Sequence, residues 1–315
     1  MTDSGNPPVI ALYGPTGTGK TACAVELASS FGGEVVNADS RYLYRHLNIG
    51  VAKPTLEERR GVSHHLIDIF EPQDVITIAQ VQQLAYAAMN DITARGALAI
   101  LAGGTPLYMN AIVEGWQIPE VAPDWDFRNE LAARIEREGL ASVAAELAII
   151  DPAAFARSGQ NSRRVIRALE VFKVTGFPMS TLEGKEPPPY RILKVALTRD
   201  REDLYPLLDQ RIDDQIAQGL LAEVRGLMNM GMTGEEPAFS AIGYRQLVPV
   251  IAGVQSLDQA VARIKHDTHR YVRHQMTWLR RIPDLHWVET GTDDWQLRVK
   301  TLVEQHIEST STCEP

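Results

Sequence analysis

The chain of 315 residues is 44% hydrophobic and 23% charged, so it can bury the core of one large or two modest domains. Its two cysteines, Cys23 and Cys313, are too few for a disulfide framework or a cysteine-based zinc site. No run of 18 apolar residues and no basic, apolar leader is present, so we expect a cytoplasmic protein without a membrane span. The net charge of −9 excludes a protein that is basic throughout, but not a local basic patch that binds nucleic acid.

Strands and helices alternate along the first part of the chain. Residues 8–14, PVIALYG, are an apolar run ending in glycine, which is typical of a buried parallel strand. Residues 21–31 have a helical pattern that Gly32 and Gly33 end, and residues 34–40, EVVNADS, resemble a second strand with a polar end.

Three further segments continue the alternation. Apolar residues from Ile78 to Ile92 recur at helical spacing, and residues 97–105 and 192–198 predict two more buried strands. The sequence therefore predicts an α/β fold, in which a doubly wound parallel sheet has helices on both faces.

Residues 116–189 interrupt this alternation with consecutive helical patterns and no strand between them. The helical patterns cover 124–137, 140–149 and 162–175. We expect residues 116–189 to be an inserted helical subdomain. Residues 1–115 would form the first part of the core, and residues 190–315 would complete it with a basic helix, roughly 257–281, and a disordered tail from His306.

Residues 14–21, GPTGTGKT, match the P-loop pattern in its required place between a strand and a helix. Backbone N–H groups of such a loop bind phosphate oxygens, and its lysine adds a full positive charge. The pattern predicts a P-loop NTPase-like fold and a site for a di- or triphosphate, without saying which. The residues of this site are Gly14, Pro15, Thr16, Gly17, Thr18, Gly19, Lys20 and Thr21. The hydroxyl of Thr21 can hold Mg²⁺.

Asp39 follows the second predicted strand, at the edge of the sheet where doubly wound folds bind ligands. The strand at 97–105 ends without the carboxylate that most ATPases and GTPases place there. Asp39 beside the P-loop is therefore a candidate general base, although an Asx-turn or helix cap with Ser40 explains the same spacing. His64 and His65 are adjacent and have no third ligand nearby in the sequence, so we do not expect a metal site there.

Residues 263–281 contain six Lys or Arg, three His and one acidic residue, a local reversal of the overall charge. One helix face carries Arg270, Arg273, Thr277 and Arg280. Such a face suits a phosphate backbone, although an ordinary solvated helix has the same composition. A second basic cluster, Arg163, Arg164 and Arg167, begins another predicted helix and favours an RNA partner.

The order of several motifs resembles the tRNA dimethylallyltransferases (isopentenyltransferases) from about residue 9 to residue 281. The motifs are GPTGTGKT, NADS, YRHLNIGVAKP, HHLID, GGTPLY, RALEVFKVTGFPMS, GLLAEV, IGYRQL and HQMTWLR. The resemblance implies transfer of a dimethylallyl group from dimethylallyl diphosphate to the exocyclic amine of the adenosine 3′ to the anticodon, in tRNAs that read codons beginning with U. The P-loop would then bind the diphosphate of the donor rather than a nucleotide.

The resemblance also implies roles for individual residues. Asp39 would accept the proton of the amine, and Thr16, Lys20, Arg211 and Mg²⁺ would stabilise the departing diphosphate. From the residues alone, Arg211 is a surface arginine paired with Asp213 or Asp214. The tRNA anticodon stem-loop would contact Asp39, Ser40, Arg41, Tyr42, Thr105, Arg128, Arg163, Arg164, Val165, Ile166, Arg167, Ala241, Ile242, Gly243, Tyr244, Arg245, Arg270, Arg273 and Gln275. We expect a monomer, and base flipping of the target adenine.

The sequence departs from the family pattern at a few positions. Tyr42 replaces a frequent Gln, Ser162 a frequent Asp, and Leu207 a frequent Arg. Two usual arginines of the basic helix are His269 and His274, so tRNA affinity is expected to rise as the pH falls from 8 to 6.

Two other functions use the same features. A small-molecule or nucleoside kinase would use ATP at the P-loop and would not need the basic helix. A non-catalytic RNA-binding module would leave Asp39 without a role.

Overall fold

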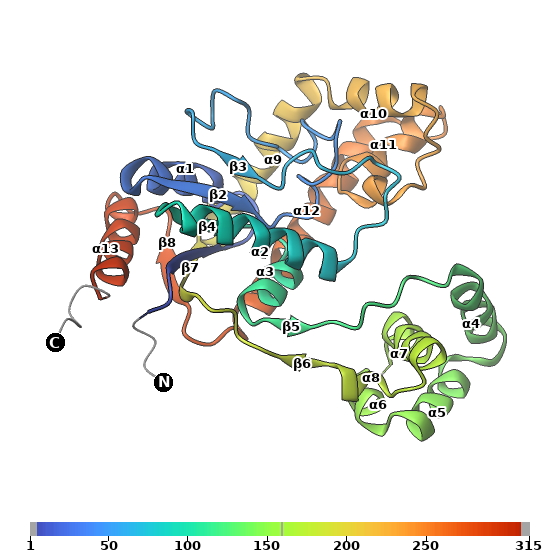
Figure 1. The fold of residues 1–315 in the computed structure, drawn as a ribbon. Coiled ribbons are helices and arrows are strands. Elements are labelled where there is room, and N and C mark those ends of the chain that lie inside the picture. Colours follow the sequence, from blue (N-terminus) through green and yellow to red (C-terminus); the bar gives the residue numbers. More distant parts are fainter. Residues whose placement is uncertain (1–4, 159, 310–315) are drawn as a thin grey trace. The chain divides into compact units, whose positions relative to one another are not determined.

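The computed structural model describes residues 5–158 and 160–309 (Figure 1). The chain forms two compact units, the first made of residues up to 113 and from 189 onward, the second of residues 114–188. The division predicted from the sequence set the insertion at 116–189, within two residues of these bounds.

The first unit is built on a parallel six-stranded sheet with the order β3-β2-β4-β1-β7-β8. The strands are β1 (Pro8–Tyr13), β2 (Gly33–Asn37), β3 (His64–His65), β4 (Leu98–Ala102), β7 (Arg191–Thr198) and β8 (His286–Glu289). β1 is central, and it pairs with β4 on one side and β7 on the other. The predicted doubly wound α/β fold is confirmed.

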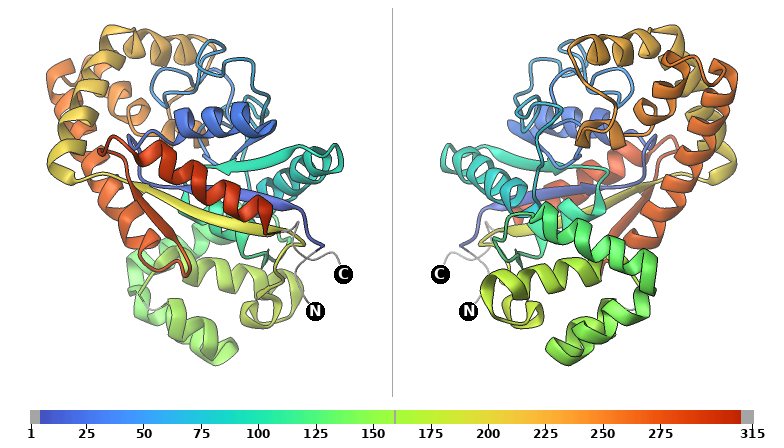
Figure 2. Two further views of the ribbon diagram at one scale, coloured as in Figure 1. Left: turned by 90° about the vertical axis from the view of Figure 1, so that its left-hand side faces the viewer. Right: turned by 90° about the vertical axis from the view of Figure 1, so that its right-hand side faces the viewer.

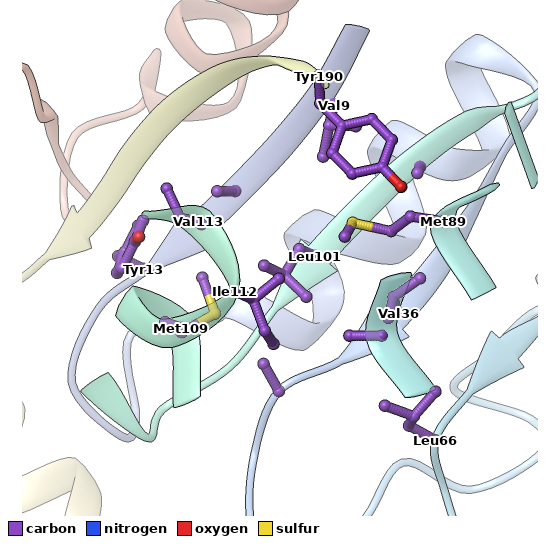
Figure 3. Close-up of a cluster of buried hydrophobic side chains, with 14 of the residues drawn as sticks. Val9, Tyr13, Val36, Leu66, Met89, Leu101, Met109, Ile112, Val113 and Tyr190 are labelled. Carbon is purple, nitrogen blue, oxygen red and sulfur yellow. The ribbon is translucent and has the colours of Figure 1, made fainter. Parts of the chain in front are cut away.

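Both faces of this sheet are buried, because successive side chains of each strand point to opposite sides. Val9, Ala11 and Tyr13 of β1 pack on the face covered by α2 (Ile78–Ala94) and α3 (Pro106–Val113). Figure 3 shows this face, where Met89 of α2 and Ile112 of α3 lie near Leu101 of β4. The opposite face of the sheet is covered by α1 (Lys20–Phe31) and α13 (Trp295–Glu308), and α13 is the red helix in the left view of Figure 2.

A helical layer of the first unit forms a further core around Phe239, Tyr244 and Leu47. Its elements are α9 (Arg201–Ala217), α10 (Leu220–Asn229), the 3₁₀ helix η1 (Pro237–Ser240), α11 (Tyr244–Ile251) and α12 (Leu257–Leu279). A capping box formed by Ser256 and Gln259 starts α12, the predicted basic helix, which ends two residues earlier than predicted.

The second unit is a small helical bundle with its own core around Leu131, Leu147 and Val165. Its helices are α4 (Trp125–Glu138), α5 (Leu140–Ile150), α6 (Pro152–Ser158), α7 (Ser162–Thr175) and α8 (Met179–Leu182). Among the described residues no strand lies between helices α4 and α7, as expected. One strand pair was not predicted: β5 (Trp116–Gln117), which precedes α4, pairs antiparallel with β6 (Gly184–Lys185), which follows α8. Strands of two residues are too short for any hydrophobic period to predict.

The C-terminal part differs most from the prediction. β8 adds an edge strand to the sheet, and α13 buries Val299 and Val303 against it. The predicted disordered tail is wrong for His306 to Glu308, which belong to α13, and residues 310–315 lie outside the described residues. Within the described part of the chain, none of the helices combines the length and hydropathy that a membrane-spanning segment needs.

Candidate active site

The P-loop connects the end of β1 to the start of α1, as its sequence pattern predicts. Gly14 has φ 146°, and a Cβ there would lie 2.5 Å from the carbonyl oxygen of Leu197 in β7. Gly19 has φ 82° and caps α1, which begins at Lys20. Glycine is therefore required where the loop passes β7, and it is favoured where the loop turns into the helix. The N-terminus of α1 points its N–H groups at the loop, which suits an anion.

Lys20 lies inside this loop, where its Nζ donates a hydrogen bond to the carbonyl of Pro15 at 2.7 Å. Burial lowers the pKa of Lys20 to about 8, Asp39 opposes this effect, and Arg211 adds to it. A partly buried lysine with a lowered pKa has too little negative charge around it to offset its desolvation. A diphosphate would supply that charge.

Asp39 follows β2 and is held through its backbone by the buried side chain of Asn37. Asn37 accepts a hydrogen bond from the Asp39 N–H at 2.9 Å and donates one to its carbonyl at 3.0 Å. The Oδ1 of Asp39 accepts from the Arg41 N–H at 2.9 Å, which is the Asx-turn that the spacing allowed. The turn uses one carboxylate oxygen and orients the other. Asn37 was not among the predicted site residues, although a polar residue at the end of a buried strand is a signal for it.

Asp39 lies close to Lys20 of the P-loop, as expected, although β4 separates β2 from β1 in the sheet. Gly103 and Gly104 follow β4 and have no side chains that would fill the space between Asp39 and Lys20. A methyl group on Gly104 would lie 3.1 Å from Asp39 Oδ2 and 3.9 Å from Lys20 Nζ. A methyl group on Gly103 would meet the backbone of Ala38 at 2.5 Å. The absence of side chains at these two positions is what brings Asp39 and Lys20 to one point.

Gln275 of α12 reaches the same point from the opposite side. Its Oε1 accepts a hydrogen bond from the Thr16 N–H at 3.1 Å, and its Nε2 donates to the carbonyl of Gly104. Only 1% of Gln275 is exposed, and its contact with tRNA remains a prediction. In this structure it fastens the P-loop to the turn after β4. The hydroxyl of Tyr271, one turn earlier, also donates to the Gly104 carbonyl, at 3.2 Å.

Arg211 of α9 faces the site rather than the surface acids. It influences the pKa values of Lys20 and Tyr42, whereas Asp213 pairs with Lys265 at 2.8 Å and Asp214 accepts from Gln210 at 2.9 Å. The implied position of Arg211 near the diphosphate therefore fits better than the surface ion pair.

Tyr42 and Ser40 are both fixed by hydrogen bonds at the rim of the site. The Tyr42 hydroxyl donates to the carbonyl of Ala52 at 2.8 Å and interacts with the Thr21 hydroxyl. Burial raises the pKa of Tyr42 to about 12. Thr105 accepts from the Ser40 N–H at 3.1 Å. These contacts set the positions of Thr21 and Thr105 from the loop that follows β2.

In the second unit, the predicted tRNA contacts fall into two groups. Arg163 and Arg164 are exposed at the start of α7, whereas Val165 is fully buried in the bundle core, and its contact with tRNA remains a prediction. Arg128 and Arg167 both bind the buried Glu170, at 2.7 and 2.6 Å. Their contact with tRNA remains a prediction, and so does that of Ile166, which is partly buried.

The predicted stretch from Ala241 to Arg245 is mostly internal. Ala241, Gly243 and Tyr244 are buried in this structure, and their contact with tRNA remains a prediction. The Tyr244 hydroxyl donates a hydrogen bond to the Glu223 carboxylate. The pKa of Tyr244 is raised, chiefly by burial and also by the nearby Glu223. Ile242 is partly buried and Arg245 is exposed.

The basic face of α12 is exposed at Arg270, Arg273 and His274. His269 differs, because its Nε2 lies 2.9 Å from Asp209 Oδ1 and its ring stacks on Tyr205 at 4.0 Å. A charge on His269 would therefore be balanced by Asp209 within the protein. The expected rise of tRNA affinity at low pH remains a prediction.

The family model described as IPP transferase matches residues 42–282 of this chain. A tRNA dimethylallyltransferase of Thermomicrobium roseum is 51% identical over 305 residues, which cover 96% of this chain and 93% of that protein. The chain belongs to the IPP transferase family. The resemblance predicted from the motifs is thereby confirmed.

Solved structures of IPP transferases have the same fold as this chain. The tRNA isopentenylpyrophosphate transferase of Bacillus halodurans is 34% identical, with a TM-score of 0.73 and coverage of 97% of this chain and 98% of that one. A eukaryotic dimethylallyltransferase acting on tRNA is 23% identical, with a TM-score of 0.80 over 97% of this chain and 80% of that one. At that identity the likeness concerns the fold alone.

Proposed function

We propose that the protein transfers a dimethylallyl group from dimethylallyl diphosphate to the exocyclic amine of the adenosine 3′-adjacent to the anticodon. Its substrates would be tRNAs that read codons beginning with U, the product would be N6-isopentenyladenosine, and the enzyme would act as a cytoplasmic monomer. The observation that carries the proposal is the meeting of Asp39, Lys20 and Gln275 around Gly104 in a member of the IPP transferase family.

The first requirement of this reaction is to bind and stabilise a diphosphate. As the allylic C–O bond breaks, both of its electrons leave with the diphosphate, where negative charge accumulates. The loop N–H groups and the partly buried ammonium of Lys20, at the N-terminus of α1, would stabilise that charge. Arg211 adds a second positive charge beside Lys20. Because these groups are fixed before the donor binds, little reorganisation is needed during the reaction.

The second requirement is to remove a proton from a weak nucleophile. The adenine amine is weakly basic because its lone pair is delocalised into the ring. As the new N–C bond forms, the nitrogen becomes positive and its proton passes to Asp39. Asn37 and the Asx-turn hold this carboxylate beside Gly104.

Mg²⁺ fits the residues at the P-loop as an ion bound mainly by the donor. The described residues contain no group of three His, Cys, Asp or Glu that could bind a metal without a substrate. Mg²⁺ usually keeps several waters and binds substrate phosphates with one or two protein oxygens, and the Thr21 hydroxyl would be one. When bound, it would neutralise charge on the diphosphate.

A transfer assay tests the proposal. The protein is incubated with radiolabelled dimethylallyl diphosphate, Mg²⁺ and bulk tRNA, and label is expected in the RNA. The Asp39→Ala variant should lose transfer while tRNA binding stays largely intact. Formation of ADP from ATP with a small acceptor would instead support the kinase, and tRNA binding without either reaction would support an RNA-binding module.

A further inference from the structure

Asp267 of α12 is a buried carboxylate to which three arginines converge. Its side chain is 3% exposed. A guanidinium nitrogen of Arg245, at the start of α11, lies 3.4 Å from its oxygens, and those of Arg263 and Arg270 on α12 lie at 3.1 and 3.2 Å. Three positive charges thus surround one negative charge, which leaves a net positive surface on a chain whose overall charge is −9.

The carboxylate of Asp267 is fixed from the interior of the protein. The buried side chain of Gln246 donates to Asp267 Oδ2 at 2.8 Å, and its own Oε1 accepts from the Gly243 N–H at 2.9 Å. Burial by itself would raise the pKa of Asp267, but hydrogen bonds from Gln246, His266 and Arg263 lower it. Asp267 is therefore an anchored negative charge rather than a mobile surface residue.

The three guanidinium groups remain open to solvent on their outer side. The side chains of Arg245, Arg263 and Arg270 are 46%, 57% and 57% exposed. A guanidinium has five N–H donors, and its planar fork matches the oxygens of a phosphate. Since Asp267 takes only a part of the donors of each arginine, it orients the arginines and leaves them able to bind an anion.

The position along α12 indicates which anion. Gln275, which lies in the reaction site, is eight residues further along the same helix, about 12 Å at 1.5 Å per residue. If one base of an RNA strand lay in the reaction site, the neighbouring phosphates of that strand could reach the three arginines, because the separation along α12 is only about 12 Å. An acidic protein would match the charge equally well but has no reason to lie at this end of the helix.

We infer that Asp267 is a positioning residue that arranges Arg245, Arg263 and Arg270 as a binding surface for the RNA phosphodiester backbone near the reacting nucleotide. The inference rests on the proposed function and extends it to Asp267 and Arg263. It differs from a simple basic patch in one respect: here the acidic residue promotes RNA binding.

The Asp267→Asn variant separates these two ideas because they predict opposite effects. Removing a negative charge from a simple basic patch would tighten RNA binding. If Asp267 positions the arginines, their mutual repulsion spreads them apart and the Kd for an anticodon stem-loop rises roughly tenfold. The matched control is Asp258→Asn, which removes the same charge from an exposed position on the same helix and should leave the Kd unchanged or slightly lower. Fluorescence anisotropy with a labelled stem-loop measures both.

The Arg263→Gln variant tests the surface if Asp267→Asn does not fold, because Arg263 is largely exposed. Loss of one phosphate contact should reduce the slope of log K against log salt concentration by about 0.7. Binding by folded Asp267→Asn as tight as wild type, or an unchanged slope for Arg263→Gln, would overturn the inference and leave the surface to another anionic partner. Stem-loop binding is independent of prenyl transfer, so a protein that binds RNA through these residues without transferring label contradicts only the proposed function.

Discussion

Two carboxylates, Glu170 in the helical unit and Asp39 at the strand ends, show how different surroundings give one chemical group different uses. Glu170 is fully buried and accepts hydrogen bonds from Arg128, Arg167 and the Asp124 N–H at 2.6 to 2.8 Å. Asp39 is partly exposed, and its Oδ1 accepts the backbone N–H of Arg41. Its Oδ2 borders the space that Gly104 leaves.

The difference teaches what a general base requires. Burial would raise the pKa of Glu170, but its hydrogen bonds, chiefly from Arg128 and Arg167, lower it, so the group is held in its charged form. A carboxylate whose oxygens are all engaged cannot readily take a proton from a substrate. Asp39 keeps one oxygen at the space beside Lys20, which is what the base proposed above requires. Glu170 stabilises the fold, whereas the catalytic role of Asp39 is a proposal.

The Asp39→Asn variant tests the contrast between Asp39 and Glu170 most directly. The asparagine side chain can still accept the Arg41 N–H, so the turn and the fold should be preserved. The loss of the base should lower the rate of transfer by about 10²- to 10⁴-fold. Single-turnover transfer to tRNA measures the rate, and urea denaturation should give the wild-type midpoint. A midpoint far below wild type would place Asp39 with Glu170 as a structural group.

The Glu170→Gln variant should have the opposite effect to Asp39→Asn, because it should lower the stability of the helical unit. Removing one partner of a buried ion pair leaves Arg128 and Arg167 with uncompensated charge, which costs about 3–5 kcal/mol. Hydrogen exchange of the α4 and α7 amides should rise far more than that of the sheet, because these helices belong to the second unit. Wild-type protection of α4 and α7 would contradict the structural role of Glu170.

Asn37→Ala tests whether Asp39 depends on its neighbour. The variant loses the hydrogen bonds to the backbone of Asp39, and transfer should fall roughly tenfold, equivalent to about 1.4 kcal/mol. Coupled residues are not additive, so the same change should have little further effect on the rate in Asp39→Asn protein. Asn110→Ala, at another buried asparagine, controls for the loss of a buried amide. Fully additive losses would show that Asn37 acts independently of Asp39.

Glu34 also accepts hydrogen bonds from positively charged side chains, but it is less buried than Glu170, so its substitution should have the smallest effect on stability. Hydrogen bonds, first from Arg95 and then from His65, lower the pKa of Glu34 to about 2 although burial opposes them. Its stabilising contribution is complete above the ordinary pKa of 4.5 and is lost as the pH falls towards 2. Since Arg95 is about half exposed, we expect Glu34→Gln to cost only about 1 kcal/mol at pH 7. The difference in urea midpoint between the variant and wild type should be smaller at pH 3 than at pH 7. An equal difference at both pH values would contradict this prediction.

The sequence predicted those features that depend on neighbouring residues. The P-loop, the helical insertion and the basic helix were found from contiguous patterns, because backbone phosphate binding and helix periodicity are local properties. β8 and the short pair of β5 and β6 were missed because strands of two to four residues carry too little pattern.

For the site residues, the sequence determined their chemical types and their order along the chain, and the motifs identified the family. Only the tertiary structure decided which faces turn inward. Periodicity places Gln275 and Arg273 on different sides of α12, but packing against the P-loop decides that Gln275 is the buried one. In the same way, Glu170 engages Arg128 from 42 residues away, and Gly104 matters because β4 lies between Asp39 and Lys20. Such contacts join distant segments, and no local pattern encodes them.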